Sequence, residues 1–511
     1  MAEEALKPSP ELMENVPVRL RRQIVSGMRW SLWLSILAAP FGYGTSVLLA
    51  RVSPEALGTY GLLMVYITLV LCWFYLGGDA VIIKYVPMLD PSERLGFLLS
   101  YLLVVCAFLA LWLGLAAVWP EALHYFFGES GGAPFHVLII CLSPIPIIYS
   151  LVAAALKGTM EIRWAQTMRR VLTIGSFIVY GVLLLAAGQW IRAYYTYIIW
   201  GVYLGLTGLT TVLGVRYLMR LESWKTNVHR VRFSLPPGFW RFTFSLQQLS
   251  ALTFFIRKLD YLLVLNFGGL AVLGLYVAII SLADIIRVLA EYFLETLLPS
   301  LTNLLASKNL EGASQVLSMN LRVIFIVTLG ITSGLLFLVS PITALLGPSY
   351  TPLQHLFVLM LVFFGITLPG SVGAILLTSV GKQQMTVWVG LLQVGLMVLL
   401  FFTLWPRYRL LGVTLAYGIS LAVTGILVLA VAKWTVPVKF SALRDYALFI
   451  TVCILAGGVA IRLAPVWMFA ALPAWMATMG LYLVLARYRL AECRDLLRCF
   501  VPGRLSRVFS S

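Results

Sequence analysis

Apolar residues dominate this chain in long runs that short polar segments separate. From Gly27 onward each run is close to the 17 to 25 residues that a helix needs to cross roughly 30 Å of hydrocarbon. The runs lie at about 27–50, 61–85, 95–119, 135–156, 171–187, 194–215, 240–266, 270–298, 317–339, 353–380, 387–405, 410–432, 446–461 and 466–486. The pattern predicts an all-α, polytopic membrane protein with about 14 transmembrane helices and no sizeable soluble domain.

Composition agrees with this prediction, and the distribution of charge adds an orientation. Of the 511 residues, 61% are hydrophobic and 11% are charged, against about 25% charged in soluble domains. The net charge is +17, but only five of the 37 Lys and Arg residues fall on the predicted outer side, at Arg51, Arg192, Arg407, Arg409 and Arg462. Because basic loops stay in the cytoplasm, we expect both termini to be cytoplasmic and no nucleic-acid partner.

The longest basic loop, between Arg216 and Arg241, separates the first six predicted helices from the other eight. The last two of those eight are an extra pair. We expect a cytoplasmic N-terminal tail over 1–26, which lacks the apolar core and cleavage site of a signal peptide. The predicted parts that follow are an N-terminal lobe over 27–217 (helices 1–6), a basic cytoplasmic linker over 218–239, a C-terminal lobe over 240–432 (helices 7–12), helices 13–14 over 433–487 and a basic cytoplasmic tail over 488–511.

An internal repeat relates the two groups of six. Ala56-Leu57-Gly58-Thr59-Tyr60 aligns with Val272-Leu273-Gly274-Leu275-Tyr276 at an offset of 216 residues. Each segment follows the first span of its half, and we expect 51–60 to form a short outer turn. Both halves begin on the same side of the membrane. The sequence therefore predicts two six-helix lobes in parallel repeat around a central cavity, plus two extra C-terminal helices.

A row of charges lies in the second half. Asp284, Arg287, Glu291 and Glu295 fall within roughly 80° of one helix face, and Asp284 is near the middle of its predicted span. A charge at membrane depth costs on the order of 2.5 to 3.5 kcal/mol. The row is therefore either the wall of a cavity that handles polar cargo or a structural Asp284–Arg287 pair that holds two helices together.

The preceding span and the second span also carry charges. Arg257, Lys258 and Asp260 lie in the span over 240–266, where Arg257 is about 6 Å outward of the midpoint. In the second span, Asp79 is about a turn and a half from Lys84, and we expect it to be an interfacial charge that reaches the membrane surface.

Several short motifs, taken in order, resemble a known family of transporters. They are Leu48-Leu49-Ala50-Arg51-Val52-Ser53-Pro54-Glu55-Ala56-Leu57-Gly58-Thr59-Tyr60, Arg257-Lys258-Leu259-Asp260, Leu273-Gly274-Leu275-Tyr276, Leu298-Pro299-Ser300-Leu301 and Gly381-Lys382-Gln383-Gln384. Over roughly residues 20 to 485 the chain resembles polysaccharide flippases, of the lipid-linked oligosaccharide or O-antigen type. These belong to the multidrug/oligosaccharidyl-lipid/polysaccharide exporter superfamily.

The resemblance implies a secondary transporter of the bacterial or archaeal plasma membrane. It would flip undecaprenyl-linked oligosaccharide from the inner to the outer leaflet by alternating access, for cell-surface polysaccharide biosynthesis. The first, second, seventh and eighth helices would line the cavity. The implied partners are the lipid-linked oligosaccharide, membrane lipids, and a polysaccharide polymerase and glycosyltransferases. No cofactor is expected.

The resemblance also indicates site residues. Arg257, Arg287 and Lys258 would suit a pyrophosphate or acidic sugars. The full set of cavity candidates is Arg257, Lys258, Asp260, Asp284, Arg287 and Glu291. The sequence departs from relatives by placing acids beside Arg287. Asp284 and Glu291 either bind a coupling proton or sodium ion or balance charge, and the sequence leaves this choice open.

Other functional classes are disfavoured by missing motifs. No Gly-x-x-x-x-Gly-Lys-Ser/Thr segment of an ATP-driven pump occurs, and the four histidines have no metal-ligand spacing. A membrane glycosyltransferase or polymerase would need a catalytic acid and a large outer loop. We therefore expect no enzyme, and the main alternative function is a drug/cation antiporter of the same superfamily.

Overall fold

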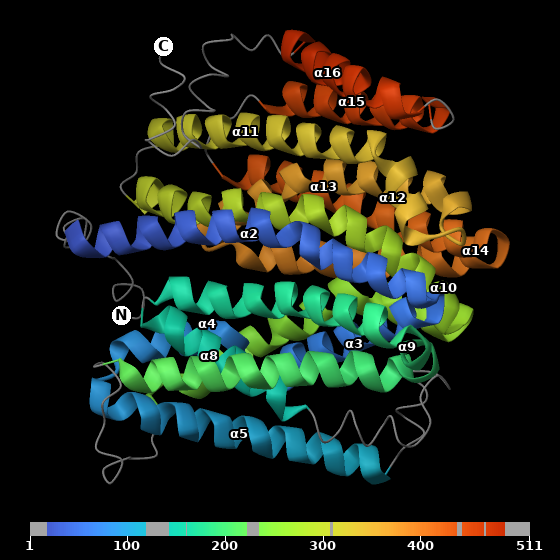
Figure 1. The fold of residues 1–511 in the computed structure, drawn as a ribbon. Helices are drawn as coiled ribbons and strands as arrows, with labels where there is room; N and C mark the ends of the chain where they lie inside the picture. The colour runs from blue at the N-terminus through green and yellow to red at the C-terminus, as the bar shows by residue number, and fades with distance from the viewer. Residues whose placement is uncertain are drawn as a thin grey trace, which may run out of the picture. The chain divides into compact units, whose positions relative to one another are not determined.

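The computed structural model describes residues 18–118, 143–159, 161–221, 235–306, 310–436, 442–463 and 467–485. Its elements are α2 (Val18–Val52), α3 (Pro54–Trp73), α4 (Gly78–Tyr85), η2 (Val86–Met88), α5 (Pro91–Val118), α8 (Pro144–Gly158), α9 (Ile162–Arg220), α10 (Phe239–Ala306), α11 (Leu310–Phe337), α12 (Val339–Leu346), η5 (Thr351–Leu353), α13 (Gln354–Ser379), α14 (Gln383–Thr435), α15 (Ala442–Leu463) and α16 (Trp467–Leu485) (Figure 1). The described residues form no strand, so the predicted all-α class is confirmed.

Three of these helices each contain two membrane-crossing arms. In α9 the Tyr180 hydroxyl donates to the Ile199 carbonyl at 2.9 Å, although 19 residues of straight helix would separate them by about 28 Å. Non-helical backbone divides α10 at Gly269 (φ 78°) and α14 at Arg409 (φ 48°). With these divisions the described helices provide 14 crossing segments, which confirms the predicted number.

The second span differs from its prediction at both ends. The expected outer turn over 51–60 is wrong, because α2 continues to Val52 and α3 already begins at Pro54. Ser53 makes this turn so short: its hydroxyl accepts a hydrogen bond from the Ala56 amide at 3.1 Å, and Pro54 suits the first turn of a helix. The span is also not continuous, because α3 ends at Trp73 and α4 begins at Gly78.

The chain forms two compact units, Met1–Ser281 and Leu282–Ser511. In the first unit α2 and α8 pack along α9, and α4 packs against α8. In the second unit α13 pairs with α14, while α11 packs against α13, α15 and α16. The boundary between the units falls inside the second arm of α10. The division into lobes at the linker over 218–239 stays a prediction.

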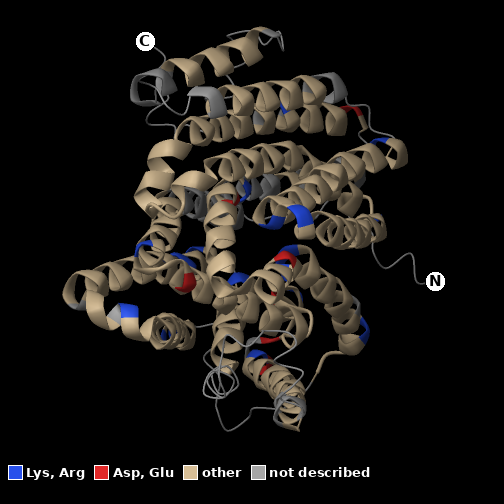
Figure 2. Cartoon of the chain, turned by 90° about the vertical axis from the view of Figure 1, so that its right-hand side faces the viewer, with Lys and Arg blue, Asp and Glu red and all other residues tan. Residues whose placement is uncertain are grey.

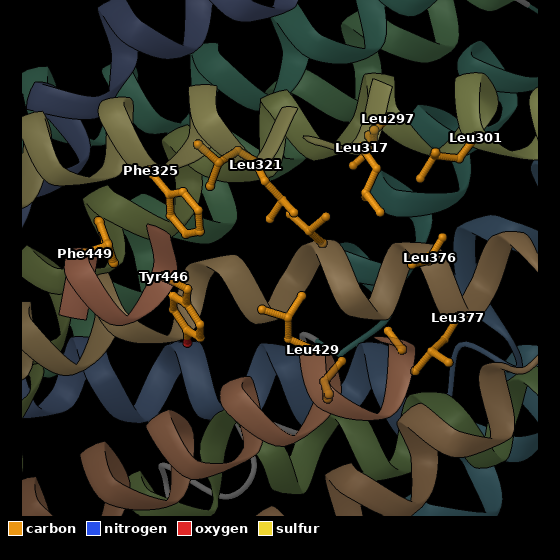
Figure 3. Packing of buried hydrophobic residues seen from close by; sticks show 14 of the residues in the cluster. Leu297, Leu301, Leu317, Leu321, Phe325, Leu376, Leu377, Leu429, Tyr446 and Phe449 are labelled. Carbon is orange, nitrogen blue, oxygen red and sulfur yellow. The ribbon is translucent and has the colours of Figure 1, made fainter. Parts of the chain in front are cut away.

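The core of the second unit combines stacked aromatic rings with close backbone packing. Phe325 of α11 lies with its ring centroid 5.9 Å from that of Tyr446 and 5.3 Å from that of Phe449, both in α15 (Figure 3). A Cβ atom at Gly373 of α13 would stand 2.8 Å from the Cα atom of Leu429 in α14. Such glycines let two helices approach closely, as is common within membranes.

The outer surfaces of the helices are apolar. Leu185 is 92% exposed and Trp434 is 80% exposed, which would be unfavourable in water but suits contact with lipid. Eight helical stretches of the described chain are long and apolar enough to cross a membrane by length and composition, and two of these are the double-armed α10 and α14. The fold is that of a multi-pass membrane protein.

Candidate functional site

The candidate residues lie on one helical hairpin, α10. Its first arm covers 239–268 and its second arm covers 270–306, separated by Gly269, whose φ of 78° and ψ of −179° interrupt the helix. One turn earlier the Asn266 side chain donates to the Leu262 carbonyl at 3.0 Å. The break at Gly269 sets the two charged segments on opposite arms.

Asp260 is buried between the two arms of this hairpin and is hydrogen-bonded across them. It is 1% exposed, and its Oδ2 accepts a hydrogen bond from the hydroxyl of Tyr276, which is 0% exposed, at 2.8 Å. The rings of Tyr261 and Tyr276 meet edge to face with their centroids 5.7 Å apart. The Oδ1 atom of Asp260 has no hydrogen-bond partner among the described residues. Asp260 therefore joins the two arms, and its assignment to a cargo cavity stays a prediction.

Arg257 and Lys258 precede Asp260 on the first arm. Arg257 is exposed, whereas Lys258 is half-buried with its Nζ atom 4.0 Å from the centroid of the Tyr261 ring. A cation above an aromatic face gains about 0.5 to 2 kcal/mol. The ring thus holds the Lys258 ammonium against the helix, and Arg257 is the more exposed of the two cations.

The second arm carries the predicted ion pair. The Arg287 Nε donates to the Asp284 Oδ1 at 2.9 Å, and the two side chains are 33% and 34% exposed. The pair occurs as the i, i+3 spacing predicts, so both readings of the charged row include it. The side chains of Glu291 and Glu295 lie outside those that the structure describes.

The structure brings some of the candidates together and leaves others apart. Arg257, Lys258 and Asp260 are in the first unit, whereas Asp284 and Arg287 are in the second. A single cavity lined by both sets therefore stays a prediction. Among the described residues no group of three or more His, Cys, Asp or Glu side chains could hold a metal ion.

The charges of the second span have partners on other helices, which the sequence did not predict. Asp79 of α4 is bonded to Lys157 of α8, whose Nζ lies 3.1 Å from its Oδ2. Lys84 instead points over the ring of Phe242 in α10, 3.6 Å from its centroid. Figure 2 shows how sparsely charged residues occur on the helices. Each pairing between elements therefore contributes to the packing of one helix on another.

The residues that stabilise the break between α3 and α4 were not predicted from the sequence. The Gln247 side chain of α10 donates to the carbonyls of Cys72 (2.9 Å) and Trp73 (2.8 Å) and accepts from the Gly77 amide (3.0 Å). Tyr101 of α5 donates to the carbonyls of residues 75 and 76 at 3.0 and 3.1 Å. The Gly77-Gly78 pair was the available signal, since both glycines have positive φ.

Comparison with known proteins identifies the architecture. No family model matches the chain and no curated relative matches it. Among solved structures, an inward-facing multidrug resistance MATE family transporter of the MOP superfamily superposes with a TM-score of 0.64 at 11% identity, covering 80% of this chain and 97% of that one. The lipid II flippase MurJ in its inward closed conformation gives 0.60 at 13% identity, covering 89% and 99%.

A third structure is a MOP superfamily transporter from Pyrococcus furiosus, described as having a binding pocket of reverse polarity. It gives a TM-score of 0.56 at 13% identity and covers 84% of this chain and 96% of that one. These neighbours are transporters and a flippase. At such low identity the likeness establishes the architecture of the chain, which agrees with the 14 crossing segments found above. The chain has the fold of the MOP superfamily transporters.

Proposed function

We propose that this protein is a secondary transporter that flips undecaprenyl-linked oligosaccharide from the inner to the outer leaflet by alternating access. On this proposal it acts in cell-surface polysaccharide biosynthesis, of the O-antigen type, in a bacterial or archaeal plasma membrane with both termini in the cytoplasm. It works beside glycosyltransferases and a polymerase, and it is not itself an enzyme. The lipid II flippase among the structural neighbours moves a lipid-linked cargo.

The single observation that carries the proposal is charge exposed at membrane depth. Arg257 is exposed near the middle of the first arm of α10, and the Asp284–Arg287 pair is about one-third exposed on the second arm. Lipid does not solvate such groups, so the part of each charged side chain that protein partners leave exposed needs water or a polar cargo. A guanidinium also binds phosphate oxygens through two parallel hydrogen bonds, which suits the pyrophosphate of a lipid-linked sugar.

The balance of accessible charge favours an anionic cargo. Asp260 is buried and accepts the Tyr276 hydroxyl, so its carboxylate is not presented at the surface of the hairpin. On the first arm the exposed charge is therefore that of Arg257. An exposed guanidinium attracts phosphate and repels organic cations.

The second candidate is a drug/cation antiporter, and two observations favour it. MATE transporters are among the structural neighbours, one with a TM-score of 0.64. Asp284 is one-third exposed, and a carboxylate in a membrane cavity can bind a cationic drug, a proton or a sodium ion. The two candidates therefore differ in which member of the Asp284–Arg287 pair contacts the cargo.

Reconstitution into proteoliposomes distinguishes them. Lipid-linked oligosaccharide is added to one leaflet, and its arrival in the other is followed with an impermeant reagent that cleaves or labels the sugar, with organic-cation efflux measured in parallel. We expect the wild-type protein to flip the lipid-linked oligosaccharide. Arg257→Ala and Arg287→Ala are each expected to lower the rate of flipping at least tenfold. Arg216→Ala, at an exposed position near the end of α9, is the matched control. Cation efflux without flipping would overturn the proposal.

A further inference from the structure

Two helices of the first unit cross in direct backbone contact at a pair of glycines. A Cβ atom at Gly58 of α3 would overlap the Leu270 carbonyl oxygen and stand 3.2 Å from the Gly274 amide nitrogen. A Cβ atom at Gly274 of α10 would overlap the Pro54 carbonyl oxygen and stand 2.9 Å from the Gly58 amide nitrogen. Only hydrogen fits at either position. We call these four residues the glycine seam.

The seam joins residues that the internal repeat makes equivalent. Its two glycines are 216 positions apart, as are its other two residues, and 216 is the offset of the repeat. One turn further along, Gly61 faces Val277 at the same offset. Gly58 packs against Leu270, four positions before Gly274, and Gly274 packs against Pro54, four positions before Gly58. Reciprocal contact between equivalent residues places a local two-fold axis through the seam.

That axis gives the seam a role, if the protein transports by alternating access as proposed above. In a transporter with two repeated lobes the cargo moves along the axis between the repeats. Residues on the axis that touch each other close this path. In the predicted topology α3 begins at the outer surface, so the closure lies on the outer side. We infer that the glycine seam is the outer gate, closed in this structure and separated when cargo is released.

The contact between Gly61 and Val277 allows the gate to be locked. A Cβ atom at Gly61 would lie 3.6 Å from the Cβ atom of Val277, within the range of about 3.5 to 4.5 Å that a disulfide requires. We therefore design Gly61→Cys/Val277→Cys in a chain whose six native cysteines are replaced by alanine. Oxidation is expected to reduce transport at least tenfold, and a reductant is expected to restore it.

A matched disulfide controls for cross-linking itself. In the second unit a Cβ atom at Gly365 of α13 would lie 3.7 Å from the Cβ atom of Thr332 in α11. Thr332→Cys/Gly365→Cys joins two helices of one predicted lobe, so its oxidation is expected to leave transport unchanged. If the Gly61/Val277 disulfide forms in full and the oxidised protein transports as fast as the protein with free thiols, the inference is wrong.

A second measurement does not depend on the cargo. In the reduced Gly61→Cys/Val277→Cys protein, a membrane-impermeant maleimide added on the outer side is expected to label the thiols as the gate opens, and to label the oxidised protein at least tenfold less. Absence of labelling in the reduced protein would overturn the gate. Labelling in a protein that transports neither oligosaccharide nor cations would refute the proposed function and leave the gate supported.

Discussion

Replacing Gln247 by leucine removes the side chain that stabilises the break between α3 and α4. Three backbone groups lose a partner: the carbonyls of Cys72 and Trp73 and the amide of Gly77, bonded at 2.9, 2.8 and 3.0 Å. Side-chain hydrogen bonds within membrane bundles contribute on average about 0.6 and at most about 1.7 kcal/mol each. Gln247→Leu should therefore lower the free energy of unfolding by about 2 to 5 kcal/mol.

The assay is reversible unfolding of the purified protein in mixed micelles, followed by tryptophan fluorescence. Gln248→Leu is the matched control, because Gln248 is the adjacent residue and is exposed. A Gln247→Leu protein within about 0.5 kcal/mol of the wild type, below the average value of a single such bond, would refute the reasoning.

Three further predictions follow from the hairpin and the seam. Arg287→Ala should slow flipping at least tenfold in proteoliposomes while stability falls by less than about 1 kcal/mol, because the pair with Asp284 is one-third exposed. Tyr276→Phe removes the buried donor to Asp260 and should lower the free energy of unfolding by about 1 to 3 kcal/mol in the same micelle assay. Gly58→Ala should cost about 1 to 3 kcal/mol by overpacking, whereas Gly205→Ala, with open space around it, should not destabilise.

The number of spans was predictable, whereas the break in the second span was not. Long apolar runs report burial in lipid regardless of neighbours, so 14 segments could be counted from the sequence. Hydropathy is insensitive to a change of backbone direction within an apolar run, so α3 and α4 were merged. Gln247 is 170 to 175 residues from the three backbone groups that it binds, and Tyr101 is 25 and 26 residues from its two. Only the fold brings these side chains to the break.

The candidate site was predictable where its interactions are local. The Asp284–Arg287 pair follows from helical spacing and occurs as expected. Partners on other segments did not follow: Asp260 is bonded to Tyr276, 16 residues away across the turn. Asp79 is bonded to Lys157, 78 residues away, although Lys84 is nearer in sequence. Local spacing gives the angle between two side chains on one helix, but pairing between helices depends on how those helices pack.

The packing of glycines has a practical consequence for engineering this protein. Gly373 has no room for a Cβ atom, whereas Gly114, Gly395 and Gly458 have no heavy atom within 4 Å of one. Alanine at these three helical positions should each add up to about 1 kcal/mol through helix propensity without disturbing a contact. Combined, they offer a more heat-resistant sample for high-resolution imaging in which the gate and the charged hairpin remain native.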